Sequence, residues 1–236
     1  SGGGSSPSFY GDVFRENHSD ELGGALHFGG CSNMLLDNIS VSGNEARWAG
    51  GVGFQGCIAE IRNSNISNNL AVSFGGGMAA DGSSIIISNS AFERDSCGWA
   101  AGGIHTWQGT LKLEGVSFSE NVAQLGGAVH SDWSTLILEG SNFSHNTATE
   151  VGGALKVFNS HMLMDSCNIE DNISLVDAGA IDYAADTLVY DSLFVVKLQN
   201  TRISNNSAGR AAGGMSIQQT HARHAMLNLS IDHCEI

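Results

Sequence analysis

The sequence predicts an all-β fold, a right-handed parallel β-helix, from three observations: an internal repeat of about 26 residues, a period-two strand pattern within each repeat, and 31 glycines with a single proline. The repeat pairs an apolar-x-x-Asn segment with a Gly-rich segment that ends in an apolar residue. FSEN (118–121) with GGAV (126–129), and FSHN (143–146) with GGAL (152–155), are adjacent copies. A unit of this length cannot bury its own apolar face but buries it against the next copy. We therefore expect a solenoid of about eight rungs with three strands in each.

Eight copies of the repeat span the chain. The central glycines of the Gly-rich segment are Gly24, Gly50, Gly76, Gly102, Gly127, Gly153, Gly179 and Gly213, in steps of 26, 26, 26, 25, 26, 26 and 34 residues. The apolar and polar residues of the other segment recur with them, as Phe14 and Asn17, Val41 and Asn44, Ile66 and Asn69, Phe92 and Asp95, Phe118 and Asn121, Phe143 and Asn146, Ile169 and Asn172, and Ile203 and Asn206. Stacked rungs place equivalent residues in columns. We expect an apolar core column and a ladder of asparagine side chains.

A strand precedes each core-column residue. Stretches such as LKLEGVSF (111–118) and LILEGSNF (136–143) alternate apolar and polar residues, which is typical of a strand. Three residues before the core column there is usually Gly or Asn, the two types that best tolerate a left-handed backbone. These predicted corners are Gly11, Asn38, Asn63, Asn89, Gly115, Gly140 and Asn200.

The repeat also defines the domain organisation. Residues 1–8 form a Gly/Ser-rich lead-in, and residues 9–236 form a single β-helix domain. The last step between glycines is eight residues longer than the usual 26, which places an insertion near residues 184–194. The final IDHCEI (231–236) matches MDSCNI (164–169), and neither end carries a polar cap. We expect a domain open at both ends that is a segment of a longer protein.

The net charge of the chain argues against two classes of partner, nucleic acids and anionic membranes. With 24 acidic and 10 basic side chains, its formal net charge is −14. Such a surface repels phosphate, so neither nucleic acid nor an anionic membrane is an expected partner. The apolar runs are far too short to span a bilayer, so we expect no direct membrane insertion. No motif calls for a cofactor.

The FxxN and GGA[ILV] pairs resemble the repeats of the chlamydial polymorphic membrane proteins. FREN (14–17) with GGAL (23–26) fits the same signature, and the resemblance covers nearly the whole chain. It implies a right-handed β-helix of the pectin-lyase-like superfamily at a cell surface, where family members act as adhesins. We therefore expect an extracellular location. Expected partners are proteins or further β-helix repeats at the open ends, with glycans as an alternative ligand.

Cysteines and sequons give two further expectations. Cys31 and Cys57 lie in adjacent rungs, each shortly after a Gly-rich segment, and we predict a disulfide between them. Glycosylation is expected at sequon asparagines outside the ladder, and it would imply a eukaryotic secretory route. In a bacterial protein the sequons would be incidental. The predicted positions are Asn38, Asn65, Asn142, Asn205 and Asn228. Asn17 and Asn172 are excluded because they belong to the ladder.

Candidate chemistry lies in two outward columns that follow the Gly-rich segments. Four rungs there gather one patch: His105, Trp107, His130, Asp132, Lys156 and Asp182. In one interpretation Trp107 stacks on a sugar, Asp132 and Asp182 act as acid and base, and Lys156 holds an anion. The chain would then be a polysaccharide-degrading enzyme, a pectin-lyase-like lyase or a glycoside hydrolase.

The second interpretation of this patch is non-catalytic. Outward positions of any solenoid are polar, and exposed Lys and Asp side chains balance one another at little energetic gain. The columns are also poorer in acids than a hydrolase groove. His105 and His130 stack as a pair without an evident third ligand, so no metal is expected. We therefore favour a structural or adhesive module, with the patch as a binding surface.

Overall fold

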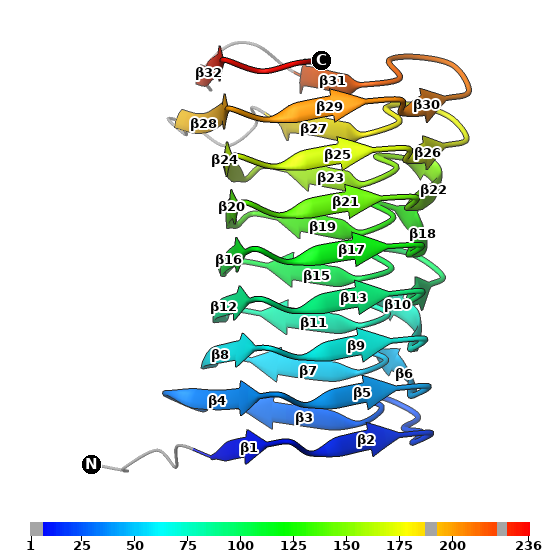
Figure 1. The fold of residues 1–236 in the computed structure, drawn as a ribbon, viewed down its shortest axis with the longest axis vertical. Coiled ribbons are helices and arrows are strands. Elements are labelled where there is room, and N and C mark those ends of the chain that lie inside the picture. The colour runs from blue at the N-terminus through cyan, green and yellow to red at the C-terminus, as the bar shows by residue number, and fades with distance from the viewer. Residues whose placement is uncertain (1–6, 187–192, 221–225) are drawn as a thin grey trace.

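The computed structural model describes residues 7–186, 193–220 and 226–236. These residues form a parallel β-solenoid of about 7 turns of ~26 residues and contain no helix. In Figure 1 the chain crosses the near side from left to right, returns across the far side and climbs, so the solenoid is right-handed. The predicted fold class is confirmed.

From the second turn on, each complete turn contains four strands, so the prediction of three strands per rung is wrong. Sheet A consists of β1 (Ser8–Tyr10), β4 (Met34–Asp37), β8 (Ile58–Arg62), β12 (Ser84–Ser88), β16 (Thr110–Glu114), β20 (Thr135–Glu139), β24 (His161–Asp165), β28 (Leu193–Gln199) and β32 (Met226–Asp232). Sheet B consists of β2 (Val13–Arg15), β5 (Ser40–Ser42), β9 (Asn65–Ser67), β13 (Ala91–Glu93), β17 (Ser117–Ser119), β21 (Asn142–Ser144), β25 (Asn168–Glu170) and β29 (Arg202–Ser204).

The strands of sheet C come directly after the ladder residues, and the strands of sheet D begin at the end of the Gly-rich segments. Sheet C, the one that the sequence did not predict, consists of β6 (Glu45–Trp48), β10 (Leu70–Phe74), β14 (Ser96–Cys97), β18 (Val122–Leu125), β22 (Thr147–Val151), β26 (Ile173–Ser174) and β30 (Ser207–Ala208). Sheet D consists of β3 (Leu26–Gly29), β7 (Val52–Gln55), β11 (Met78–Asp81), β15 (Ile104–Trp107), β19 (Val129–Asp132), β23 (Leu155–Phe158), β27 (Ile181–Asp186) and β31 (Met215–Thr220).

The predicted core column stands inside sheet B. Phe92, Phe118 and Phe143 pair in register and are fully buried. Their rings stack face to face, with centroids 5.1 Å apart between Phe92 and Phe118 and 4.9 Å between Phe118 and Phe143. On these three successive turns the same flat ring therefore packs directly on its neighbours in the core.

The predicted ladder of asparagines is also present. Asn146 is buried, and its Nδ2 donates to the Oδ1 of Asn172 at 2.9 Å and to the carbonyl of Phe118 at 3.1 Å. Its own Oδ1 accepts from the backbone N–H and the Nδ2 of Asn121. The same pattern joins Asn44 to Asn69 on earlier turns. Each side chain therefore satisfies buried backbone groups of the neighbouring turns.

The corners also follow the sequence. The predicted Gly and Asn corner residues all have positive φ, from 47° at Asn89 to 68° at Gly11. The central glycines of the repeat serve another purpose, because they stack where two chain segments nearly touch. A Cβ on Gly127 would lie 2.2 Å from the carbonyl oxygen of Gly153 and 2.7 Å from the backbone nitrogen of Thr147.

Gly127→Ala is therefore expected to destabilise the solenoid strongly. The added methyl meets backbone atoms that cannot rotate away, and overpacking of this kind costs roughly 1–3 kcal/mol or more. For a chain of this size each kcal/mol lowers the melting temperature by about 2–4 °C. Thermal unfolding followed by circular dichroism measures the effect. Gly29→Ala is the control, because a Cβ there meets nothing within 4 Å among the described residues. Equal melting temperatures for the two variants would contradict the packing argument.

The predicted domain limits can be compared only in part. Residues 1–6 of the lead-in and 187–192 of the insertion lie outside the described residues. The strands on either side of the insertion have 6 residues in β27 and 7 in β28, and their partners on the next turn, β31 and β32, have the same lengths. In the described parts of the chain no helix has the length and apolar character needed to cross a membrane.

Candidate functional site

The six residues of the predicted patch lie on the outer face of sheet D. Register pairs His105 with His130, His130 with Lys156, and Lys156 with Asp182. Trp107 pairs with Asp132 two residues further along the same strands. Neighbouring strands of this sheet therefore gather side chains that are far apart in the sequence.

Most of this face is covered, contrary to the expectation of an open patch. His105 and His130 are each 5% exposed and Asp182 is 2% exposed, whereas Trp107 is 39% exposed. Side chains from the ends of sheet C strands lie over the column, and the ring of Phe74 is 4.7 Å from that of His105, centroid to centroid. The sequence prediction has no strand between the ladder residue and the Gly-rich segment, so it does not include the side chains that cover this column.

Aromatic cover leaves a pocket of about 280 Å³. It is lined by Trp48, Phe74, Asp81, His105, Trp107 and Asp132. A larger hollow of about 570 Å³ along the edge between sheets D and A is lined mostly by glycine, serine and threonine. The smaller pocket is the candidate site because titratable and aromatic side chains converge on it.

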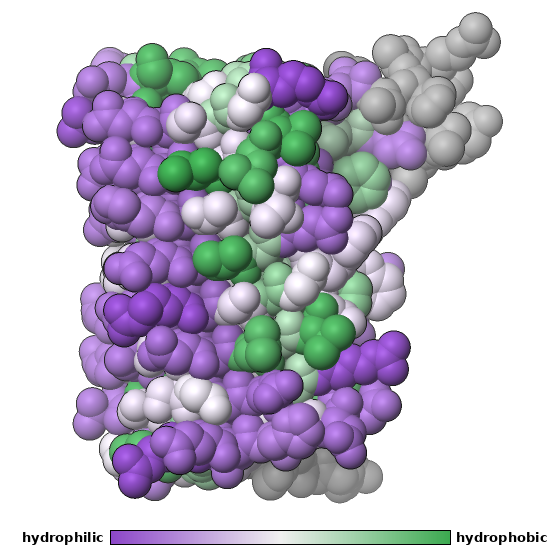
Figure 2. All heavy atoms as spheres, turned by 90° about the vertical axis from the view of Figure 1, so that its right-hand side faces the viewer, coloured by the Kyte–Doolittle hydropathy of each residue, from purple (hydrophilic) through white to green (hydrophobic). Residues whose placement is uncertain are grey.

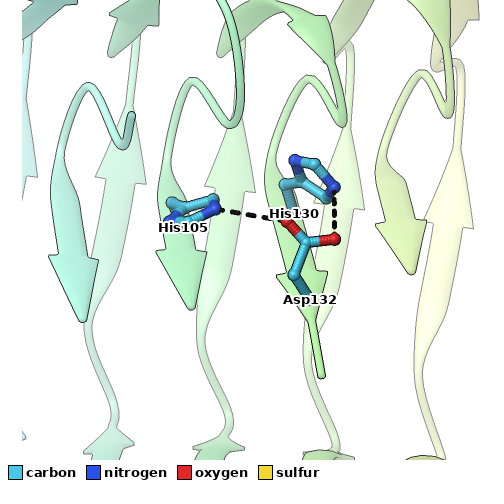
Figure 3. A group of neighbouring side chains, drawn as sticks. All are labelled: His105, His130 and Asp132. Carbon is cyan, nitrogen blue, oxygen red and sulfur yellow. Dashed lines mark ion pairs between the residues drawn. The ribbon is translucent and has the colours of Figure 1, made fainter. Parts of the chain in front are cut away.

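His105 and Asp132 line this pocket, and His130 lies beside them (Figure 3). The Asp132 carboxylate lies 3.1 Å from Nε2 of His130 and 3.6 Å from Nε2 of His105. Burial lowers the pKa of His105 despite the opposing contact with Asp132, so this imidazole is neutral at pH 7. Burial acts to raise the pKa of Asp132, but the close contacts with the two histidines outweigh it and hold that pKa well below its ordinary value.

Lys156 and Asp182 form a separate ion pair on the next two turns. The Nζ of Lys156 contacts Oδ2 of Asp182, and the side chains are only 13% and 3% exposed. The Asp182 carboxylate is therefore engaged by Lys156 beneath the surface rather than presented to a substrate.

Cys31 and Cys57 lie next to each other, as their positions in adjacent rungs require. Within the described chain both are free thiols, and the backbone N–H of Cys31 donates to Sγ of Cys57 at 3.4 Å. Burial and the neighbouring Cys57 raise the pKa of the Cys31 thiol. The disulfide between them stays a prediction.

The sequon asparagines fall into two groups, those outside the ladder and those within it. The five predicted glycan positions are all exposed, and they lie on or beside strands of sheets A and B. Asn172 is buried, and its Nδ2 donates to Oδ1 of Asn206. Asn17 bonds to Asn44 in the ladder but is itself exposed on the first turn. Glycosylation stays a prediction.

Three pocket residues were not singled out from the sequence: Trp48, Phe74 and Asp81. A signal for the first two exists, since each stands directly before a left-handed Ala or Gly that opens the Gly-rich segment, in ARWAGG (46–51) and VSFGGG (72–77). Comparison with known proteins adds no further site residue. No protein-family model matches the chain, and no curated protein or solved structure matches it significantly.

Proposed function

We propose that the chain is a non-catalytic, extracellular β-helix module that binds a protein partner through the outer face of sheet C, as a structural or adhesive part of a cell surface. A strip of apolar side chains along that face carries the proposal. Its members are each between 40 and 60% exposed: Leu70, Val72, Trp99, Val122, Ile173 and Leu175. Figure 2 looks onto this side of the solenoid, where apolar side chains run up the rod between hydrophilic flanks. Exposed apolar side chains that gather on one face mark an interaction site.

The chemistry of the strip suggests the nature of the partner. Glu45 and Glu150 are exposed on the same sheet, and the chain as a whole is strongly acidic. A partner with an apolar surface bordered by basic side chains would match both features, since complementary charge aids encounter and register. The rigid solenoid would present this strip over several turns.

Two other considerations support a cell-surface role. The repeats resemble those of the polymorphic membrane proteins, whose members are pectin-lyase-like adhesins. Glycans on the five predicted asparagines would cover sheets A and B and leave sheets C and D accessible. Further repeats packed against the terminal turns, or a glycan held by the pocket tryptophans, would complete the contacts of such a module.

The alternative of a polysaccharide-degrading enzyme has weaker support. Its proposed acid and base were Asp132 and Asp182. Asp182 is buried against Lys156, and Asp132 is engaged by two histidines. An acid–base pair needs both carboxyls within reach of a substrate.

An adhesion experiment tests the proposal. Beads coated with the chain are flowed over cultured epithelial cells, and the retained fraction is compared with that of the double variant Val72→Ser/Leu175→Ser. Ile58→Ser/Ile86→Ser is the matched control, because these apolar residues are similarly exposed, at 55% and 43%, but lie on sheet A. We expect the native chain and the control to be retained and the sheet C variant to lose most of its retention. Equal retention of all three, or none for the native chain, would refute the proposal.

A further inference from the structure

The geometry points to a binding site for a divalent transition-metal ion of the zinc class, held by His105, His130 and Asp132. These three side chains come from two adjacent strands, β15 and β19, of sheet D. Their ligand atoms all lie within 4.8 Å of one another. The site lies on a different face from the apolar strip and does not depend on the proposed adhesive function.

The distances fit a shared ion. Zinc binds imidazole nitrogen and carboxylate oxygen at about 2.0–2.1 Å, so two ligand atoms on one tetrahedral ion lie roughly 3.3–3.4 Å apart. Nε2 of His130 lies 3.1 Å from Oδ1 of Asp132, and Nε2 of His105 lies 3.6 Å from Oδ2, so the two distances lie on either side of that value. Figure 3 shows both imidazoles directed at the same carboxylate, so only small adjustments would bring the three groups around one ion.

An unsatisfied atom marks the centre of the site. Nε2 of His105 is buried and has no hydrogen-bond partner among the described residues. A buried polar atom of this kind is rare in folded proteins and is often explained by a missing ion or water. Nε2 of His105 faces the carboxylate of Asp132, and a cation between the two would bind both groups.

The donor set selects the class of metal. Two imidazole nitrogens and one carboxylate suit zinc, cobalt or nickel, whereas calcium and magnesium prefer oxygen ligands alone. Three protein ligands leave a fourth position, as in open zinc sites. His105 and Asp132 line the pocket with Trp107 and Asp81, so that fourth position would face a space able to admit water or an anionic group.

The experiment uses the chain freed of any affinity tag and dialysed against a chelator. Cobalt(II) is added as the probe and its visible absorption is recorded, followed by competition with zinc. The variants are His105→Gln, His130→Gln and Asp132→Asn, checked for folding by circular dichroism. His27→Gln is the control, because His27 lies in the same column and contacts Trp48, but its bonded neighbour is Gln55 rather than a carboxylate.

We expect the native chain and the His27 variant to bind one cobalt ion with the intense absorption of a tetrahedral site. Each ligand variant should bind more than about 100-fold more weakly, since even loss of an outer-shell partner costs 10–100-fold. Nuclear magnetic resonance of the native chain provides a second measurement that needs no variant. On zinc addition the imidazole signals of His105 and His130 should shift and those of His27 should not. Unchanged affinity in the ligand variants, or unchanged signals of His105 and His130, would overturn the assignment.

Discussion

Asp95→Asn is expected to stabilise the solenoid at neutral pH by about 2–3 kcal/mol, roughly 5–10 °C in melting temperature. Asp95 occupies a place in the asparagine ladder and is fully buried. Its Oδ1 accepts from the backbone N–H and the Nδ2 of Asn69 at 2.8 and 2.9 Å, as a ladder oxygen should. Its Oδ2 has no hydrogen-bond partner in the described part of the chain.

Asn121, the next ladder residue, shows which group the ladder needs at the position of Oδ2 of Asp95. Nδ2 of Asn121 donates both to the carbonyl of Phe92 and to Oδ1 of Asn146. An ionised carboxylate cannot donate there, so Asp95 fits the ladder only when protonated. Burial raises the pKa of Asp95 well above its ordinary value, in agreement with this geometry.

The sign of the pH dependence follows from this raised pKa. Because the folded state holds the proton more tightly than the unfolded state, the native chain loses stability as pH rises from about 4 through the folded-state pKa. Asparagine does not titrate, so the advantage of Asp95→Asn should be small near pH 4 and reach a plateau above that pKa. Urea unfolding at a series of pH values measures it.

Glu120→Gln is the control for Asp95→Asn, because it removes one negative charge at an exposed position of the following turn. A stability gain of the same size in this control would assign the effect to relief of net charge. The ladder explanation would also fail if Asp95→Asn were no more stable than the native chain at pH 7.

The largest destabilisation is expected for Asn146→Ala. The amide of Asn146 takes part in four hydrogen bonds, with Phe118, Asn172 and two groups of Asn121. Alanine leaves these buried partners unsatisfied at about 1–3 kcal/mol each. Even with partial relaxation, we expect a loss of at least about 4 kcal/mol in the free energy of unfolding, measured by urea denaturation.

Asn142→Ala is the matched control for Asn146→Ala, since Asn142 lies in the same turn on β21 but is exposed. Surface substitutions of this kind usually change stability by less than about 0.5 kcal/mol. Native-state hydrogen exchange gives a second readout, in which protection should fall first in the turns that flank residue 146. A loss of less than 1 kcal/mol for Asn146→Ala would show that the ladder contributes little.

The sequence predicted the columns well, because in a solenoid one residue type per turn must satisfy the same contact every time. Phe118 and Asn121 could be placed in this way without knowledge of the structure. Sheet C could not be predicted from the sequence for two reasons. Its strands are as short as Ser96–Cys97, and its outward positions carry apolar residues such as Val72, so the alternation typical of a half-exposed strand is missing.

Other features leave weak traces in the sequence. Glu120 and Arg94, directly before ladder residues, adopt φ of 57° and 54° although neither type favours it, because the ladder bonds fix the backbone there. The grouping at the candidate site could be predicted, since the columns place His105 beside His130, and His130 shares a face of one strand with Asp132. The burial of these histidines could not, because it comes in part from the unpredicted sheet C, whose Phe74 packs against His105.

The ladder also gives the rod a chemical polarity. From Asn17 to Asn69, and again from Asn121 to Asn172, each side-chain amide donates to the oxygen of the next turn toward the C-terminus. All these amide dipoles point the same way, so on each of these turns the amide donates toward the C-terminal end of the rod and accepts from the N-terminal end. When the C-terminal end of one rod meets the N-terminal end of another, an amide donor faces an acceptor and the ladder continues. When two equal ends meet, donor faces donor or acceptor faces acceptor. Any stacking of β-helices that extends this ladder is therefore directional.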